Sequence, residues 1–303
     1  MKRLEGIGKV QNVEGRAALW PELDRTPERK AASPLAAVAA RVRIHSLEEQ
    51  LAALQREHGD LRQALYAAAQ MQRRLCAARD VRRGRLEISS ELFAVRHIAG
   101  DFFHLQESGR TLALGAGDIA GKGITAGLWF THMVGLLRIY ANASSGPAGA
   151  LGAINRHLCQ FHGEPPLVAL FLAALDFETG EIAYSNAGQP APLLVRRNGS
   201  AQALREGGPL LGATEGAAFA CGRTRLEPGD ALIVYSDGIV ECRNAAEQEF
   251  GTERLLAAAR AAAQCSASKM LFSLLGAVQD FAGNHPRSDD LTLMVVRRTD
   301  RHQ

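Results

Sequence analysis

The sequence has few of the features that mark secreted, zinc-binding or membrane proteins. Its five cysteines are scattered and form no C-x-x-C pair, which argues against a thiolate zinc site and against a disulfide framework. The N-terminal Met-Lys-Arg is not followed by an apolar stretch, so no signal peptide is expected. The longest apolar runs, residues 124–137 and 167–175, are too short to span a bilayer. These absences predict a soluble, cytoplasmic protein without membrane insertion.

A large excess of charge of one sign is also missing. The formal net charge is +3, although residues 1–83 carry 16 basic and 10 acidic groups. No motif combines aromatic with basic residues, so nucleic-acid binding is not expected; a DNA-binding dimer using the basic N-terminal helix stays an alternative. What the chain does have is 47% hydrophobic residues over 303 positions, enough for one large domain with an appendage.

A heptad repeat begins at Ile44 and continues for about five repeats. Leucine dominates its apolar positions, and a 3.5-residue period keeps one seam of a helix facing a partner helix. The flanking charges agree, because in a parallel pair Arg43 would meet Glu48, and Glu57 would meet Arg62. The a positions are Ile44, Leu51, His58, Leu65 and Gln72, and the d positions are Leu47, Leu54, Leu61, Ala68 and Leu75.

This repeat predicts the organisation of the N-terminal part of the chain. Residues 1–43 are expected to form a flexible, partly helical tail, because they lack periodicity and contain several prolines. Residues 44–83 are expected to form a coiled-coil helix for dimerisation and signalling, with a homodimer made through residues 44–75. The alternative is a single amphipathic helix that packs against its own domain.

Residues 84–300 have the pattern of one domain that mixes strands and helices. Strand clusters and helix pairs alternate in blocks, and a short turn at residues 176–180 joins two neighbouring strands. Such turns are typical of antiparallel sheets with helices packed outside them. Strands are predicted over residues 85–98, 111–116, 167–175, 182–185, 193–197, 231–235 and 291–297, and helices over 124–141, 147–161, 252–264 and 268–282.

Aspartates recur where these apolar strands begin or end, mostly beside glycine. One such Asp-Gly is usually a simple turn, but several that meet at one rim would form an all-oxygen cluster. A cluster without histidine or cysteine suits Mg²⁺ or Mn²⁺ rather than zinc. The aspartates are Asp101, Asp118, Asp237 and the pair Asp289-Asp290.

Six short motifs follow one another across residues 85–297. They are Gly100-Asp101-Phe102-Phe103, Gly117-Asp118-Ile119-Ala120-Gly121-Lys122-Gly123, Asn186-Ala187-Gly188-Gln189-Pro190-Ala191-Pro192-Leu193, Gly208-Pro209-Leu210-Leu211-Gly212, Ser236-Asp237-Gly238-Ile239-Val240-Glu241 and Asp289-Asp290-Leu291-Thr292. In this order they resemble the SpoIIE/RsbU-type phosphatases, the bacterial branch of the metal-dependent (PPM, type 2C-like) protein phosphatases. The resemblance implies an α+β fold, a four-layer α-β-β-α sandwich of two antiparallel sheets with a two-metal centre.

The resemblance also implies a ligand set for two Mn²⁺ or Mg²⁺ ions. The ligands are Asp101, Asp118, Asp237, Asp289 and the backbone carbonyl of Ile119. Asp289 is preferred to Asp290 because the family ligand is the first of the pair. Since two cations activate water and clamp phosphoryl oxygens, we expect direct attack by metal-activated water, without a phosphoenzyme.

Two cationic residues are candidates for binding the substrate phosphate. Arg96 precedes Asp101 by the spacing at which broader family members carry a phosphate-binding arginine, and its fork suits two phosphate oxygens. Lys122 lies near the metal rim and an expected helix N-terminus. The chain departs from the family pattern at Ala120, where serine is usual, and at Gln189, where histidine is usual. Reduced rather than abolished activity is therefore expected.

The function implied by the resemblance is hydrolysis of phosphoserine or phosphothreonine on a signalling protein. The substrate is often a STAS-type anti-sigma-factor antagonist in a partner-switching pathway. The alternative is a catalytically weak or inactive scaffold of the same fold that binds a phosphoprotein. A nucleotide cyclase also joins coiled coils to two-metal carboxylate sites, but the required alternating βαβ order is not seen.

Overall fold

A computed structural model describes residues 33–76, 79–95, 98–121, 123–142, 145–161 and 163–300. The chain divides into two units, Met1–His58 and Gly59–Gln303. Helix α1 (Pro34–Leu75) supplies all the described helical residues of the first unit and continues into the second. None of the helices in the described part of the chain is both long and apolar enough to cross a membrane.

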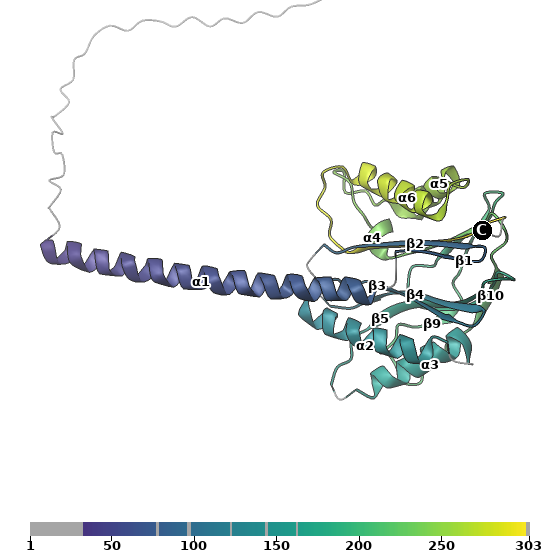
Figure 1. Cartoon of the computed structure of the whole chain (residues 1–303), viewed down its shortest axis with the longest axis horizontal. Coiled ribbons are helices and arrows are strands. Elements are labelled where there is room, and N and C mark those ends of the chain that lie inside the picture. Colours follow the sequence, from purple (N-terminus) through teal and green to yellow (C-terminus); the bar gives the residue numbers. More distant parts are fainter. Residues whose placement is uncertain are drawn as a thin grey trace, which may run out of the picture. The chain divides into compact units, whose positions relative to one another are not determined.

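Two sheets, built from strands of different lengths, form the second unit, and helices cover them (Figure 1). The first sheet has the order β1 (Asp80–Arg83), β2 (Leu86–Phe93), β12 (Leu291–Arg298), β11 (Ala231–Tyr235), β7 (Leu193–Val195) and β8 (Ala201–Ala203). The second has the order β10 (Gly222–Arg225), β6 (Glu181–Ala187), β5 (Val168–Asp176), β4 (Thr111–Ile119) and β3 (Phe102–Ser108). Strand β9 (Gly207–Gly208) pairs with β6.

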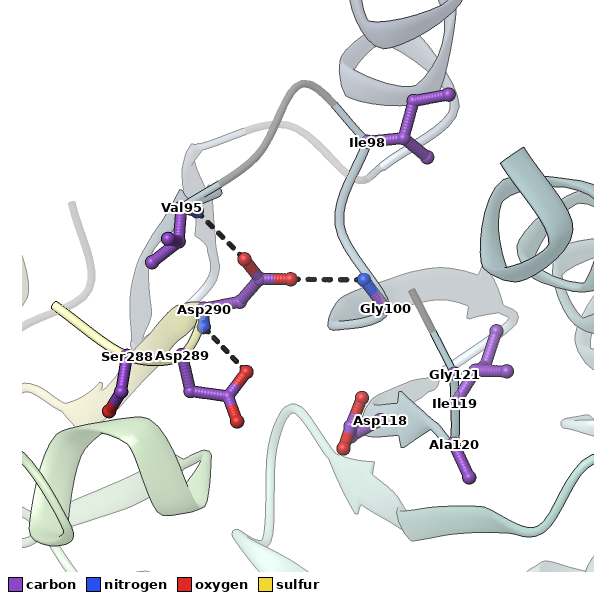
Figure 2. A pocket seen from close by; sticks show the side chains of 10 residues that line it. All are labelled: Val95, Ile98, Gly100, Asp118, Ile119, Ala120, Gly121, Ser288, Asp289 and Asp290. Carbon is purple, nitrogen blue, oxygen red and sulfur yellow. Dashed lines mark hydrogen bonds between the residues drawn. The ribbon is translucent and has the colours of Figure 1, made fainter. Parts of the chain in front are cut away.

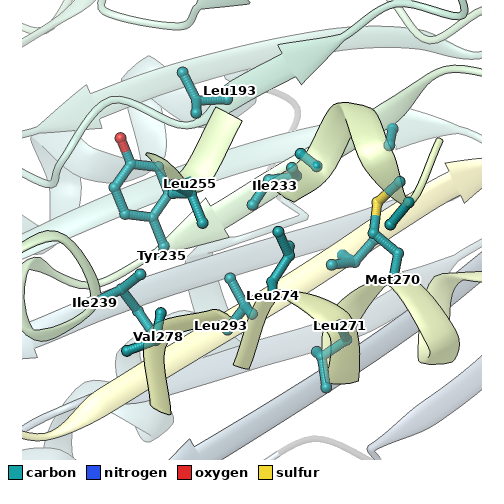
Figure 3. Close-up of a cluster of buried hydrophobic side chains, with 14 of the residues drawn as sticks. Leu193, Ile233, Tyr235, Ile239, Leu255, Met270, Leu271, Leu274, Val278 and Leu293 are labelled. Carbon is teal, nitrogen blue, oxygen red and sulfur yellow. The ribbon is translucent and has the colours of Figure 1, made fainter. Parts of the chain in front are cut away.

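Helices α2 (Ile124–Tyr140) and α3 (Gly146–Cys159) pack on the second sheet. Helices α5 (Gly251–Ala261) and α6 (Ala267–Ala282) pack on the first, and the short helix α4 (Asp237–Val240) follows β11 (Figure 1). Phe103 and Phe171 are buried in a core between the sheets, and Phe130 in a core beneath α2 and α3. Leu274 and Leu293 belong to the core between the first sheet and its helices (Figure 3).

The sequence prediction of a mixed α+β fold with two sheets is confirmed. Almost all strand pairs are antiparallel, but β9 lies parallel to β6, which the sequence pattern did not predict. The first helix begins at Pro34, inside the tail that was predicted to be partly helical. It ends at Leu75, and residues 80–83, predicted as part of the helix, form β1 instead. Five strands were not predicted: β3, and the four short strands β1, β8, β9 and β10, which have at most four residues each.

The last turns of α1 pack against the domain that follows them. Ala69 and Gln72 are buried, and the Gln72 side chain donates to the Ala99 carbonyl at 2.7 Å and accepts from the Ala99 amide at 3.0 Å. Gln72 was assigned to the dimer seam as an a position. It is instead covered by its own domain, because its amide pairs with both the backbone N–H and the backbone C=O of the buried Ala99.

Candidate metal centre

Strand alternation places two of the predicted aspartates between the sheets. Ala116 of β4 belongs to the core between the sheets, so Asp118, two residues further along, lies on the same face. Phe103 of β3 also belongs to that core, which places Asp101, two residues earlier, on the same side. Because β3 and β4 are antiparallel neighbours, the start of β3 lies beside the end of β4.

The first sheet brings two more aspartates to this edge. Asp237 follows β11 and begins α4, and Asp289 comes just before β12. Strands β11 and β12 are antiparallel, with Tyr235 opposite Leu293, so the end of one lies beside the start of the other. The four predicted aspartates therefore come from the ends of two adjacent strand pairs, one pair in each sheet.

Gly100 gives the oxygens of this centre room to approach one another. A Cβ added at Gly100 would lie 2.8 Å from Asp118 Oδ1 and 2.9 Å from the Ile119 carbonyl oxygen. Any larger residue would push against both oxygens, one of them on the backbone. The carboxylate of Asp118 and the carbonyl of Ile119, both predicted ligands, thus face the same glycine.

The pair Asp289-Asp290 divides into two roles. Both oxygens of Asp290 accept backbone hydrogen bonds, from the Val95 amide at 2.8 Å and from the Gly100 amide at 3.0 Å (Figure 2). Asp289 uses only Oδ1, which accepts from the Asp290 amide at 2.9 Å. The two hydrogen bonds of Asp290 therefore fix the backbone that precedes Asp101. Asp289 still has its second carboxylate oxygen, Oδ2, to offer to another partner.

Burial, and after it the repulsion between like charges, raises the pKa values of these carboxylates. Burial, and then the negative charge of Asp118, raises the pKa of Asp101 well above its usual range; its side chain is only 2% exposed. Burial and the charges of Asp237, Asp289 and Asp290 raise the pKa of Asp118 to about 6. Burial, with Asp289 adding to it, also raises the pKa of Asp237. The site therefore gathers negative charge that its own residues do not neutralise.

Glu241 is a further carboxylate at this centre that the sequence analysis did not assign. Its pKa is raised by burial and by the charges of Asp237, Glu249 and Asp289, and Arg243 lowers it in part. It lies four residues after Asp237, across the single turn of α4. That i, i+4 spacing within the Ser236–Glu241 motif was the signal that could have identified it.

The donor set fits hard divalent cations. All the converging groups are oxygens, and the buried Asp101 Oδ2 and Thr292 Oγ1 have no hydrogen-bond partner among the described residues. The described part of the chain holds no ready cluster of three or more His, Cys, Asp or Glu side chains that could bind a metal ion. Cations would therefore have to draw the carboxylates closer, and their charge would offset both the burial and the repulsion that raise the pKa values.

The remaining predicted residues have different outcomes. Arg96 and Lys122 lie outside the described residues. Ala120 lines the pocket of about 90 Å³ that contains Asp118 and Asp289 (Figure 2). Gln189 is buried in a separate pocket beside Asp237.

Comparison with known proteins places this chain in a family. Residues 108–299 match the family model described as Stage II sporulation protein E (SpoIIE). The chain is 25% identical over 243 residues to protein IcfG of Synechocystis sp., covering 70% of this chain and 38% of IcfG. It is 23% identical over 242 residues to the phosphoserine phosphatase RsbU of Bacillus subtilis, covering 79% of this chain and 71% of RsbU.

A solved structure shares the fold. The structure of the RsbU and RsbW domains of Rv1364c from Mycobacterium tuberculosis superposes with a TM-score of 0.66 at 26% identity, covering 75% of this chain and 64% of that one. The chain thus spans less than two thirds of that protein, and well under half of IcfG.

Proposed function

Because this chain belongs to the SpoIIE family of PP2C-type phosphatases, we propose that it is a metal-dependent protein serine/threonine phosphatase. The observation that carries the proposal is the convergence of Asp101, Asp118, Asp237 and Asp289 from two sheets onto one uncompensated acidic centre. Solved structures with this fold include RsbX in complex with magnesium and PstP with two manganese ions. We propose two Mn²⁺ or Mg²⁺ ions as the cofactors here.

The chain's own residues would divide the work of the reaction. Asp101, Asp118, Asp237, Asp289 and the Ile119 carbonyl would hold the cations. When bound, the cations would lower the pKa of water and balance the charge of the phosphoryl oxygens. Asp290 fixes the backbone of Gly100 and so positions the neighbouring Asp101. No cysteine or serine nucleophile is needed for this chemistry.

We propose a phosphorylated STAS-type anti-sigma-factor antagonist as the substrate, within a cytoplasmic partner-switching pathway. The proposal is supported by the similarity to RsbU and to the RsbU and RsbW domains of Rv1364c. The competing possibility is a scaffold of the same fold that binds the phosphoprotein without hydrolysing it. A measurement of phosphoprotein hydrolysis distinguishes the phosphatase from the scaffold.

The test is release of phosphate from a phosphoserine protein by the full chain with Mn²⁺. We expect hydrolysis that EDTA stops, together with an increase in melting temperature on adding Mn²⁺ to the metal-free protein, since a ligand that binds only the folded state stabilises it. Asp237→Asn should weaken both effects. Unchanged melting temperature and no phosphate release at excess Mn²⁺ would exclude this function; Mn²⁺ binding without turnover would favour the scaffold.

We further propose that α1 forms a parallel coiled-coil homodimer. The seam side chains Ile44, Leu47, Leu51, Leu54 and Leu61 are all more than half exposed, which is unusual for a regular row of large apolar groups. Gln72 and Leu75, at the far end of the predicted seam, lie at the domain instead. The partner helix is therefore proposed to contact residues 44–61.

Charging this seam is expected to dissociate the dimer. The double variant Leu51→Glu, Leu54→Glu should sediment as a monomer at micromolar concentration, because each buried leucine contributes about 1.5–3 kcal/mol and four would be lost per dimer. Leu35→Glu is the matched control, since Leu35 is exposed on the same helix but lies off the seam. The oligomeric state is measured by analytical ultracentrifugation. The proposal would be contradicted if the wild-type protein were a monomer, or if Leu35→Glu dissociated the dimer as strongly as the double variant.

A further inference from the structure

A second pocket adjoins the acidic centre. It has a volume of about 520 Å³, and its lining includes Asn186, Gln189, Arg205, Asp237 and Glu241. Asp237 belongs to both, because it is one of the four aspartates of the centre and also lines this pocket together with Glu241. The pocket therefore lies next to the place where a substrate phosphate would bind.

The floor of this pocket is built before any ligand binds. The Asn186 side chain accepts from the Gln189 amide and donates to the Gln189 carbonyl, both at 2.9 Å. Gly188 between them has a φ of 80°, which other residues rarely adopt. A Cβ at Gly207 would lie 1.8 Å from the Asn186 carbonyl oxygen, so the adjoining segment is packed directly on this turn. The turn is thereby held in one conformation.

Two donors of the pocket lack partners. Gln189 is 6% exposed, and its Nε2 makes no hydrogen bond with any described residue, although a buried unpaired donor is unfavourable. Arg205 is exposed, and no ion pair or side-chain hydrogen bond of it is seen among the described residues; its charge acts on Tyr235, whose pKa it partly lowers. The cation that lowers the Glu241 pKa is Arg243, not Arg205. The pocket thus has an acidic wall toward the centre and one exposed cation elsewhere on its lining.

We propose that Arg205 selects substrates carrying an acidic side chain close to the phosphoserine, with its guanidinium binding that carboxylate beside the fixed Asn186–Gln189 turn. The inference rests on the proposed phosphatase function and adds a specificity determinant to it. The ligand is an acidic phosphopeptide segment. A guanidinium suits this role because it presents several fixed donors to a carboxylate.

The test compares two phosphoserine peptides that differ only in having glutamate or lysine beside the phosphoserine. For the wild-type chain with Mn²⁺, we expect kcat/KM to favour the glutamate peptide by about fivefold, as for an exposed charge pair. Arg205→Glu should reverse the preference, and Arg205→Ala should remove it. The ratio between peptides is measured within each variant, so a general loss of activity cancels. Arg223→Glu, the same change at another exposed arginine, should keep the wild-type ratio.

A binding measurement keeps this inference separable from the phosphatase proposal. Non-hydrolysable phosphonate versions of both peptides, labelled for fluorescence anisotropy, should show the same preference and the same reversal. Discrimination without any hydrolysis would support the pocket and count against the phosphatase. The pocket assignment would be overturned if the chain hydrolysed both peptides with a kcat/KM ratio that Arg205→Glu left unchanged. It would also be overturned if neither peptide bound.

Discussion

Asp118→Asn is expected to abolish phosphate release while making the metal-free protein more stable. The activity should fall about 10³-fold or more, because cation chemistry at such centres supplies several kcal/mol of barrier reduction. The stability should rise because the carboxylate is partly buried and lies among like charges, which together raise its pKa from the usual 3.8 to about 6. An asparagine keeps the shape but carries no charge that is buried or repelled.

The sign of the pH dependence follows from that shift. In the unfolded chain Asp118 loses its proton near pH 3.8, whereas in the folded protein it holds the proton until about pH 6. The folded state is therefore favoured at low pH, and its stability falls as the pH rises from about 4 to 6. Allowing for partial solvent exposure, the cost at pH 7 is about 1–2 kcal/mol, equivalent to about 2–6 °C in melting temperature.

Asp176→Asn is the matched control for this experiment. Asp176 also ends a strand of the same sheet, but hydrogen bonds from the Thr179 and Glu178 amides help to lower its pKa. Its replacement should lower stability equally at pH 5 and pH 7, because the lowered pKa keeps the carboxylate ionised at both; this loss would disappear only at a pH low enough to protonate Asp176. Melting curves in EDTA at pH 5 and pH 7 give the comparison. A destabilised Asp118→Asn protein at pH 7 would show that the carboxylates are not crowded.

The sequence was most informative where strands are long and buried. β4, β5, β11 and β12 were predicted within about three residues of their observed ends, because apolar runs between turn residues leave few alternatives. β1 and β10 were missed because Asp-Val-Arg-Arg and Gly-Arg-Thr-Arg have no apolar pattern of their own. They are strands because each pairs with a longer neighbour, β2 or β6.

The candidate centre was predictable in composition but not in arrangement. Motif order supplied Asp101, Asp118, Asp237 and Asp289, because short motifs survive where overall identity is low. Spacing along the chain cannot predict which aspartate oxygens accept backbone hydrogen bonds and which are left for cations. The part that Asp290 plays depends on backbone amides from the loop between β2 and β3 that meet it only in the folded chain.

The same limit applies to the first helix. A heptad pattern predicts that one face of a helix is buried, but it does not identify the partner that buries it. For Gln72 the covering groups are the backbone N–H and C=O of Ala99, one residue before Gly100. For residues 44–61 no described residue of this chain provides the cover, which leaves a second copy as the proposed partner.

Asp290→Asn and Asp289→Asn are expected to fail in opposite ways. Asp290 accepts from two backbone amides with its two oxygens, and an asparagine must turn its NH₂ group toward one of them. The loss should be about 2–3 kcal/mol, mainly from the less exposed Gly100 amide, and should show as a lower melting temperature in EDTA. Asp289→Asn keeps the single hydrogen bond to the Asp290 amide, so its melting temperature should not fall.

The activities should separate in the complementary way. With Asp289 as a cation ligand, Asp289→Asn should lose most phosphate release and much of the stabilisation that Mn²⁺ gives the wild-type protein. Asp290→Asn should retain the Mn²⁺-induced increase in melting temperature and recover part of its activity at lower temperature, because its defect lies in holding the Gly100 segment. If Asp290→Asn instead lost Mn²⁺ binding with unchanged stability, the two aspartates would have to exchange roles, and the hydrogen bonds to Val95 and Gly100 would have to open when the cations bind.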